Sequence, residues 1–247
     1  SKRLRSLMGN DCFSFPKDEE ILSSFIDSFT DKNSLILDFF SGSATTAHAV
    51  MQLNSEDGGN RKFIMVQLPE KTDEKSEAFK AGYKNICEIG KERIRRASKK
   101  IKEESPLTTQ DLDTGFRVLK LDSTNMQDIY YSPKDISQAD LFSQVDNVKP
   151  DRTGEDLLFQ VMLELGATLD SKIETTTVAG KTIYNVAEGY LVACFDPDVT
   201  DEVVKAIAQM QPAYAVLRDT SMKDDSTATN FEQIFKTYSP DTVTKIL

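Results

Sequence analysis

Residues 35–53 constrain the fold of this chain more than any other segment. Residues 35–37 are apolar and lead into Asp38, and a Ser-Gly-Ser turn and a pattern rich in Ala, Val, Met and Leu follow. A strand, a glycine turn and a helix in this order form the first unit of a doubly wound α/β fold. Such folds bind adenosine-containing cofactors at this turn, so the sequence predicts a ligand site there.

The residue types in the turn suit a charged ligand. Gly42 lets the backbone pass close to a ligand where a side chain would collide. The free amides at the start of the following helix attract a carboxylate or a phosphate. Asp38 can accept a hydrogen bond from a ligand ammonium, and four hydroxyls surround the turn: Ser41, Ser43, Thr45 and Thr46. A single glycine turn is a weak signal by itself, because many α/β proteins carry one without a ligand.

Two flanking segments strengthen the prediction. Residues 61–70 have the pattern of a second strand with polar groups at its end, where such folds contact ribose hydroxyls through a residue such as Gln67 or Glu70. Upstream, Phe13 and Phe15 precede a helix expected over residues 20–29. Their rings could pack against an adenine-bearing ligand or simply fill the core, and both interpretations stay open.

Composition excludes several classes of protein. The chain has 247 residues and is 39% hydrophobic, which suits one or two domains with a real core. It has no apolar run near the roughly 20 residues that span a bilayer and no secretory signal, so we expect no membrane association. It does not begin with Met, which suggests an excised fragment. Three separated cysteines, Cys12, Cys87 and Cys194, form no metal spacing or disulfide framework and fit a reducing, cytoplasmic setting.

The single histidine, His48, follows the glycine turn. As a catalytic base it would need a nucleophile and an orienting acid. A histidine on a helix near a pocket more often packs or lies at the surface, and we expect that of His48.

Charge divides the chain in two. Residues 1–104 hold 18 basic and 17 acidic side chains, whereas residues 105–247 hold 12 basic and 23 acidic ones. A helical pattern over residues 75–104 ends in a basic run at 91–102, which is either a solvated helix face or a contact for nucleic-acid phosphates. Residues 104–109 break this helix. We therefore predict a cofactor-binding domain over residues 1–104 and an acidic domain over 105–247 that would repel a DNA backbone.

The second part has the pattern of a small mixed α/β domain. Residues 125–150 are its least regular stretch, and we expect an exposed or partner-ordered loop there. Strands are expected over residues 116–121, 172–178, 182–186, 190–195 and 213–218, helices over 156–169, 201–210 and 231–238, and an apolar end at 243–247.

Three motifs in order carry a resemblance to a known family. They are Phe-Ser-Phe-Pro-Lys at residues 13–17, Leu-Asp-Phe-Phe-Ser-Gly-Ser-Ala-Thr-Thr-Ala-His-Ala-Val at 37–50 and Arg-Lys-Phe-Ile-Met-Val-Gln-Leu-Pro-Glu at 61–70. Together they resemble DNA amino-methyltransferases that use S-adenosylmethionine, and most of all the modification subunit of type III restriction-modification systems. Residues 86–96, 114–121 and 215–222 are also similar to that subunit, so the resemblance runs from about residue 11 to the end.

The resemblance implies a fold, a cofactor and its site. The fold would be α/β, with a partial Rossmann-like S-adenosylmethionine-binding fold followed by the smaller mixed α/β domain. The family methylates the exocyclic amine of an adenine that is flipped out of the duplex. Gln67 stands where many relatives carry an acid for the ribose, and Glu70 could substitute; Ala44 replaces a second glycine. The implied cofactor-binding residues are Phe15, Pro16, Lys17, Asp38, Phe39, Ser41, Gly42, Ser43, Thr45, Gln67 and Glu70.

One part of the family's machinery is missing from the sequence. These enzymes hold the flipped adenine with an Asp-Pro-Pro-Tyr-type motif that lies upstream of the cofactor loop in this branch. None of the eight prolines of this chain adjoins another, and Asp196-Pro197 in the second domain lacks the second proline and the aromatic. We therefore predict no catalytic residue here and no methyltransferase activity for this chain alone.

The resemblance also implies partners for the full subunit. These are double-stranded DNA, the restriction subunit of the same system and a second copy in a homodimer, with residues 111–247 expected to make assembly contacts. Two alternatives remain at this point. A different α/β nucleotide enzyme, such as a dehydrogenase, is weakened by the missing three-glycine fingerprint. A non-catalytic interaction module is supported by the acidic second part.

Overall fold

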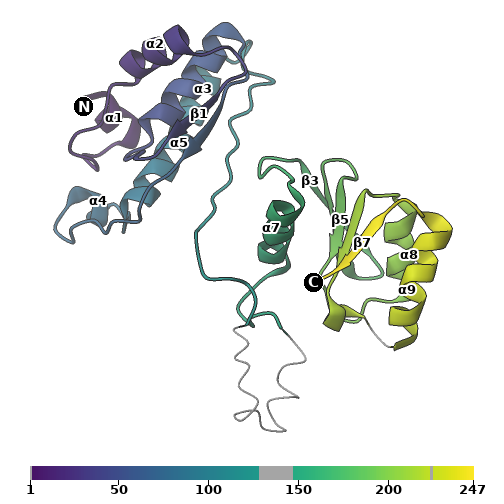
Figure 1. The fold of residues 1–247 in the computed structure, drawn as a ribbon. Helices are drawn as coiled ribbons and strands as arrows, with labels where there is room; N and C mark the ends of the chain where they lie inside the picture. The colour runs from purple at the N-terminus through teal and green to yellow at the C-terminus, as the bar shows by residue number, and fades with distance from the viewer. Residues whose placement is uncertain (1, 128–146, 223–224) are drawn as a thin grey trace. The chain divides into compact units, whose positions relative to one another are not determined.

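The structure, a computed structural model, describes residues 2–127, 147–222 and 225–247 (Figure 1). The chain forms two compact units, Ser1–Phe116 and Arg117–Leu247, which we describe separately. The irregular loop predicted at residues 125–150 lies largely outside the described residues.

The first unit contains the predicted strand, turn and helix. Its strands β1 and β2 pair in parallel, with Leu35 opposite Lys62 and Asp38 opposite Met65, which confirms both strands. The elements of this unit are α1 (Lys2–Met8), α2 (Glu19–Phe29), β1 (Leu35–Asp38), α3 (Thr45–Asp57), β2 (Lys62–Met65), α4 (Glu77–Lys80) and α5 (Ile86–Glu104).

The single helix predicted over residues 75–104 is wrong. Gly82 adopts a left-handed conformation with a φ of +94°, which ends the short helix α4. A new helix then begins at α5, where the Asn85 side chain accepts a hydrogen bond from the backbone amide of Glu88. The chain therefore turns between α4 and α5.

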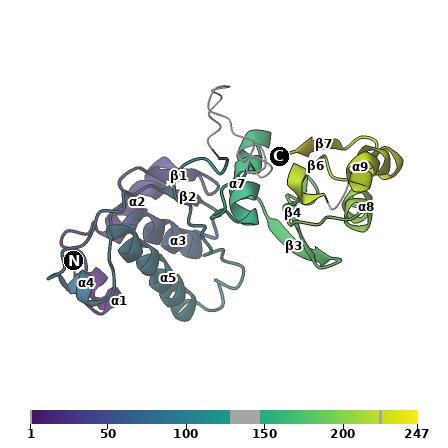
Figure 2. The same cartoon turned by 90° about the horizontal axis from the view of Figure 1, so that it is seen from below.

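One face of the two-stranded sheet is covered by helices. Ile36 packs against α2 and α3, and Phe63 and Met65 pack against the cluster that α3 and α5 form. Figure 2 shows α3 and α5 on one side of β1 and β2. The side chains that alternate with these point the other way, and Leu35 and Leu37 are 61% and 47% exposed. The described residues therefore leave the second face of this sheet open, whereas parallel sheets are ordinarily covered on both faces.

The two units divide later than the predicted position at 104/105. Leu112 and Phe116 pack against the cluster between α3 and α5, and the guanidinium of Arg95 lies 5.6 Å from the centre of the Phe116 ring. The next residue, Arg117, donates a hydrogen bond to the Ser171 carbonyl in the second unit. Residues 105–116 therefore belong with the first unit.

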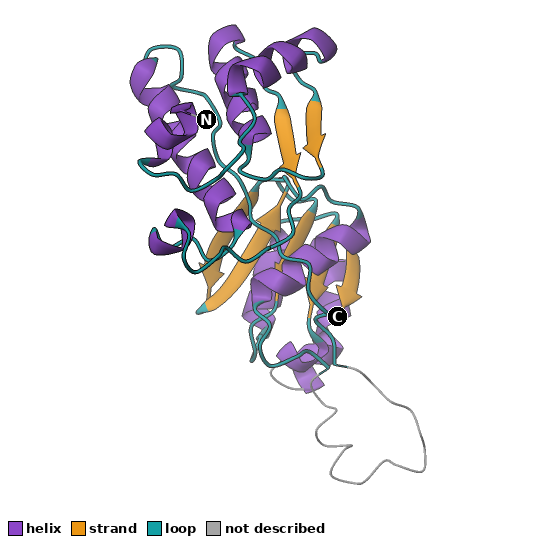
Figure 3. Ribbon diagram, turned by 90° about the vertical axis from the view of Figure 1, so that its left-hand side faces the viewer, coloured by secondary structure: helices purple, strands orange, loops and turns teal. Residues whose placement is uncertain are grey.

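The second unit is a mixed sheet with helices, as predicted (Figure 3). The strand order is β3-β4-β5-β6-β7, antiparallel from β3 to β5 and parallel from β5 to β7. The strand predicted at residues 116–121 is wrong, because no strand forms there. The elements are α7 (Gly154–Leu165), β3 (Ile173–Val178), β4 (Lys181–Val186), β5 (Leu191–Cys194), α8 (Asp201–Gln209), β6 (Tyr214–Leu217), the 3-10 helix η1 (Asp219–Ser221), α9 (Asp225–Tyr238) and β7 (Val243–Ile246).

Strand β5 is the centre of the second unit's core. Leu191 and Ala193 face the cluster that includes residues of α7, while Val192 and Cys194 face the cluster of α8 and α9. All four side chains are fully buried, because helices cover both faces of the sheet at this strand.

Candidate functional site

The loop between β1 and α3 is anchored at the carboxyl ends of both strands of the first unit. Gly42 has a φ of +51° and Ala44 a φ of 57°, so the chain turns through two left-handed residues before α3 begins. The amide of Ser41 donates to the Val66 carbonyl at 3.1 Å, and the amide of Gly42 donates to Oε1 of Gln67 at 2.7 Å. The structure thus brings together Ser41, Gly42 and Gln67, three residues of the predicted set.

Asp38 shapes the same loop from the end of β1. Its Oδ1 accepts the amide of Phe40 at 3.0 Å, and its Oδ2 accepts the hydroxyl of Thr46 at 2.6 Å. Each carboxylate oxygen keeps a further lone pair that could accept a proton from a ligand. Asp38 therefore fixes its own loop before any ligand is considered.

Phe13, which the predicted set of binding residues omitted, lies against the loop. A Cβ built on Gly42 would lie 3.3 Å from Cζ of Phe13, which is tighter than an ordinary van der Waals contact, so any larger residue at position 42 would push against this ring. Phe15 is instead 88% exposed. Among the described residues, no hydrogen bond or ion pair joins the side chains of Phe15, Lys17 or Glu70 to the loop, so their roles stay predictions.

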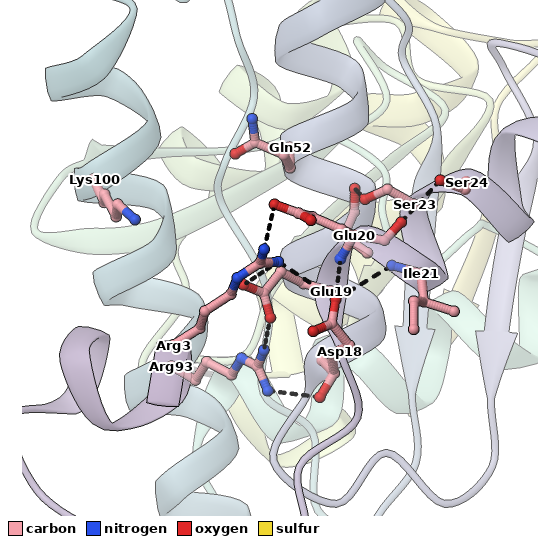
Figure 4. Close-up of polar contacts among 12 residues, drawn as sticks. Arg3, Asp18, Glu19, Glu20, Ile21, Ser23, Ser24, Gln52, Arg93 and Lys100 are labelled. Atoms are coloured by element: carbon pink, nitrogen blue, oxygen red, sulfur yellow. Dashed lines mark hydrogen bonds and ion pairs between the residues drawn. The ribbon is translucent and has the colours of Figure 1, made fainter. Parts of the chain in front are cut away.

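A buried arginine of helix α5, Arg93, forms hydrogen bonds with the loop. Arg93 of α5 is 1% exposed, and its Nη1 donates to the hydroxyls of Ser43 at 3.0 Å and Thr45 at 2.6 Å. Its Nη2 lies 3.5 Å from a carboxylate oxygen of Glu19 at the start of α2 (Figure 4). Burial lowers the pKa of Arg93 to about 10, and the charge of Glu19 acts in the opposite direction. Arg93 therefore remains charged at neutral pH.

Helix α5 approaches the loop closely at Gly90. A Cβ at Gly90 would lie 3.4 Å from Cβ of Ala44 and 3.5 Å from the carbonyl oxygen of Gly42. Because Gly90 has no side chain, α5 lies close enough to the turn for Arg93 to contact it.

Comparisons with known proteins agree with this architecture. Residues 2–103 match the family described as DNA methylase. The chain is 45% identical over 116 residues to the Mod subunit of the type III restriction-modification enzyme StyLTI from Salmonella typhimurium, covering 47% of this chain and 18% of that subunit. It is 35% identical over 202 residues to the EcoP15I Mod subunit from Escherichia coli, covering 80% and 28%. For the EcoPI Mod subunit from Escherichia phage P1, the identity is 33% over 213 residues, covering 83% and 31%.

The chain belongs to the family of type III Mod subunits. It spans less than a third of the length of each of these relatives.

His48 packs inside the first unit of this Mod-family chain. The residue is 7% exposed, and burial lowers the pKa of its imidazole to about 4, with smaller contributions from the charges of Arg93 and Lys100. The ring is therefore uncharged at neutral pH, and its Nδ1 has no hydrogen-bond partner among the described residues. These features support the expectation that His48 has a packing role.

The basic end of α5 is largely paired with acids of the same helix. Arg96 lies 2.7 Å from Glu92 and also donates to the Met8 carbonyl at 2.6 Å. Lys99 and Lys100 lie 3.8 and 3.7 Å from Glu103 and Glu104. Of the two interpretations left open by the sequence, these pairs favour the solvated helix face.

Neither a metal site nor a membrane span is found in the part of the chain that the structure describes. No group of three His, Cys, Asp or Glu residues there could hold a metal, and the three cysteines are free. No helix within residues 2–127, 147–222 and 225–247 combines the length and the apolar character that crossing a bilayer requires.

Proposed function

We propose that this chain is the cofactor-binding and carboxyl-terminal portion of a DNA adenine methyltransferase in a type III restriction-modification system. The full subunit would transfer a methyl group from S-adenosylmethionine to the exocyclic amine of adenine. The observation that carries the proposal is the loop at residues 39–44. It turns at the carboxyl ends of two parallel strands, where α/β folds bind such cofactors, in a chain of the Mod family.

The residues of the loop fit an adenosine-containing cofactor that carries a charged amino acid group. Gly42 brings the backbone to the surface of the site, and Ser41 supplies a hydroxyl beside it, whereas the buried hydroxyl of Ser43 accepts from Arg93 and supports the loop. Asp38 can accept a hydrogen bond from the ligand ammonium. S-adenosylmethionine would supply the methyl group. The proposed binding residues remain the set predicted from the sequence, to which we add Phe13 because its ring lies against Gly42.

Gln67 holds the cofactor loop in place in this proposal. Its side-chain oxygen already accepts the Gly42 amide, and its side-chain nitrogen donates to the Leu68 carbonyl at 3.2 Å. It therefore holds the loop against the end of β2 and is a weaker candidate for the ribose hydroxyls than an unbound acid. Glu70, whose side chain is exposed three residues later, is the better candidate for that contact.

The open face of the first unit's sheet supports a requirement for more of the subunit. Leu35, Leu37 and Ile64 expose apolar surface there, and the Mod relatives are more than three times as long as the part that this chain matches. We propose that another region of the full subunit covers this face and supplies the adenine-binding motif. The chain alone would then lack methyltransferase activity.

The proposed partners of the full subunit are those that the family resemblance implies. They are duplex DNA, the restriction subunit and a second Mod copy, and we propose that all of them meet in the cytoplasm. The second unit is the proposed assembly module, because its part of the sequence carries almost twice as many acidic as basic residues and would repel DNA phosphates.

Methyl transfer tests the proposal directly. The full subunit is incubated with duplex DNA and S-adenosylmethionine, and the digested nucleosides are analysed by mass spectrometry. We expect N6-methyladenine from the full subunit and none from the 247-residue chain. Methylated cytosine in place of adenine would refute the target class, and activity of the 247-residue chain would refute the requirement for the missing motif.

A further inference from the structure

Arg93 links three separate segments of the first unit. One nitrogen of its guanidinium donates to the side chains of Ser43 and Thr45, and the other lies beside Glu19. Ser43 belongs to the loop after β1, and Thr45 is the first residue of α3. Glu19 opens α2, directly after the segment that contains Phe15, Pro16 and Lys17. The arginine thus lies between the two segments proposed to border the cofactor.

The start of α2 is held from a second side as well. Arg3 of α1 lies 2.7 Å from Glu20 and 3.4 Å from Asp18, so two arginines converge on the acidic start of this helix (Figure 4). Asp18 caps α2 by accepting the amides of Glu20 and Ile21. The position of the segment before α2 is therefore set by charged contacts, and the contact to Arg93 is the one that reaches the loop.

Stability alone does not explain a buried arginine at this place. Removing a guanidinium from water is costly, and an apolar side chain of similar volume often stabilises a core as well or better. Arg93 donates hydrogen bonds to the loop and to α3 and forms an ion pair with Glu19. Its Nε and the facing Oε2 of Glu19 have no hydrogen-bond partner among the described residues. A planar guanidinium can reach three acceptors in different directions, whereas a lysine ammonium acts as a single point.

We propose that Arg93 is a positioning residue that, together with Glu19, fixes the loop at residues 41–45 relative to the segment at 15–17. This inference rests on the proposed function. Ser43 and Thr45 would otherwise be free to rotate, and the loop could depart from the conformation that receives the cofactor. A displacement of about 1 Å in such a site is enough to weaken binding strongly.

The same unit offers a matched control. Arg61 is also buried, and it donates to Asp57 at 2.9 Å near the opposite end of α3, away from the loop. Arg93→Lys and Arg61→Lys therefore remove comparable guanidinium contacts at the two ends of one helix. Glu19→Gln and Asp57→Asn form a second, milder pair that removes the acidic partner instead.

The experiment is carried out on the full subunit. Binding of S-adenosylmethionine and S-adenosylhomocysteine is measured by calorimetry, and the Tm is recorded for each variant. We expect Arg93→Lys to raise both Kd values about tenfold, with Glu19→Gln about threefold, and both arginine variants to lower the Tm. Arg61→Lys and Asp57→Asn should stay within about twofold of the wild-type Kd. With S-adenosylmethionine at saturation, Arg93→Lys should recover most of the wild-type kcat, because its effect lies in KM.

The outcomes separate the two proposals. If Arg93→Lys and Arg61→Lys lower the Tm but neither changes the Kd by more than about twofold, Arg93 is structural only and the positioning role is refuted. If Arg93→Lys does not fold, the Kd of Glu19→Gln against that of Asp57→Asn decides in the same way. If the folded wild-type subunit binds neither S-adenosylmethionine nor S-adenosylhomocysteine, the proposed function is refuted instead.

Discussion

The stability of the first unit should depend on pH through its single buried histidine, His48. In the folded chain the pKa of His48 is about 4, whereas an unperturbed histidine titrates near 6.5. Between these values the unfolded chain binds more protons than the folded one. The stability that depends on a neutral His48 is therefore fully present above about pH 6.5 and is lost as the pH falls towards 4. Linkage with these two pKa values gives a loss of about 2 kcal/mol between pH 7 and pH 5.

Two measurements follow this loss. Because the chain has one histidine, its imidazole gives a single assignable NMR signal, whose titration reports the folded pKa directly. Hydrogen exchange of the α3 amides, compared between wild type and His48→Gln at pH 7 and pH 5, reports the stability of the first unit. From pH 7 to pH 5, the free energy of opening of the α3 amides should fall by about 2 kcal/mol more in the wild type than in His48→Gln. An imidazole that titrates near 6.5, or a difference that does not change with pH, would refute the burial argument.

Three further substitutions test other parts of the account. Leu37→Ser on the open sheet face should change the unfolding free energy of the 247-residue chain by less than about 0.5 kcal/mol, but that of the full subunit by about 2 kcal/mol; equal effects in chemical denaturation would contradict a covering region. Leu217→Ala, at a fully buried position, should destabilise the second unit by about 2–5 kcal/mol while exchange of the α3 amides stays unchanged. Thr153→Ala removes the capping box of α7 and should cost about 1 kcal/mol in the same denaturation assay, so an unchanged midpoint would show that the cap is dispensable.

Local signals were sufficient for the central unit of the site. An apolar run, an acid, a glycine turn and a helical pattern lie within 19 consecutive residues, so the strand, the loop and α3 follow from short-range rules. The hairpin of β3 and β4 is predicted for the same reason, because Ala-Gly between two strand patterns is a local turn signal. In the structure Ala179 and Gly180 take the left-handed conformations that such a turn requires.

Sequence patterns were less informative where the structure depends on a neighbouring strand or on the conformation of one glycine. Residues 116–121 alternate like a strand, but alternation does not supply the neighbouring strand that must satisfy the backbone hydrogen bonds. The helical pattern over 75–104 hid the break at Gly82, since a glycine inside such a pattern is compatible with either outcome.

Arg93 shows why the support of the loop was missed. It stands in a run of basic residues, which indicates a solvated face, and its partner Ser43 is 50 positions away in sequence. One signal was present nonetheless. Arg93 lies four residues after Ile89 and four before Ala97, both buried, so helical spacing places it on the apolar stripe of α5.

Binding of S-adenosylmethionine by the full subunit tests the central claim, the assignment of the cofactor loop, most directly. Gly42→Asp places a side chain against Phe13 and a negative charge in the turn, while Gly58→Asp, at the other left-handed glycine bordering α3, meets open space. In calorimetry we predict at least about a tenfold increase in Kd for Gly42→Asp, or about 1.4 kcal/mol, with Gly58→Asp within about twofold of wild type and both variants folded. Wild-type affinity in a folded Gly42→Asp subunit would contradict the assignment of this loop.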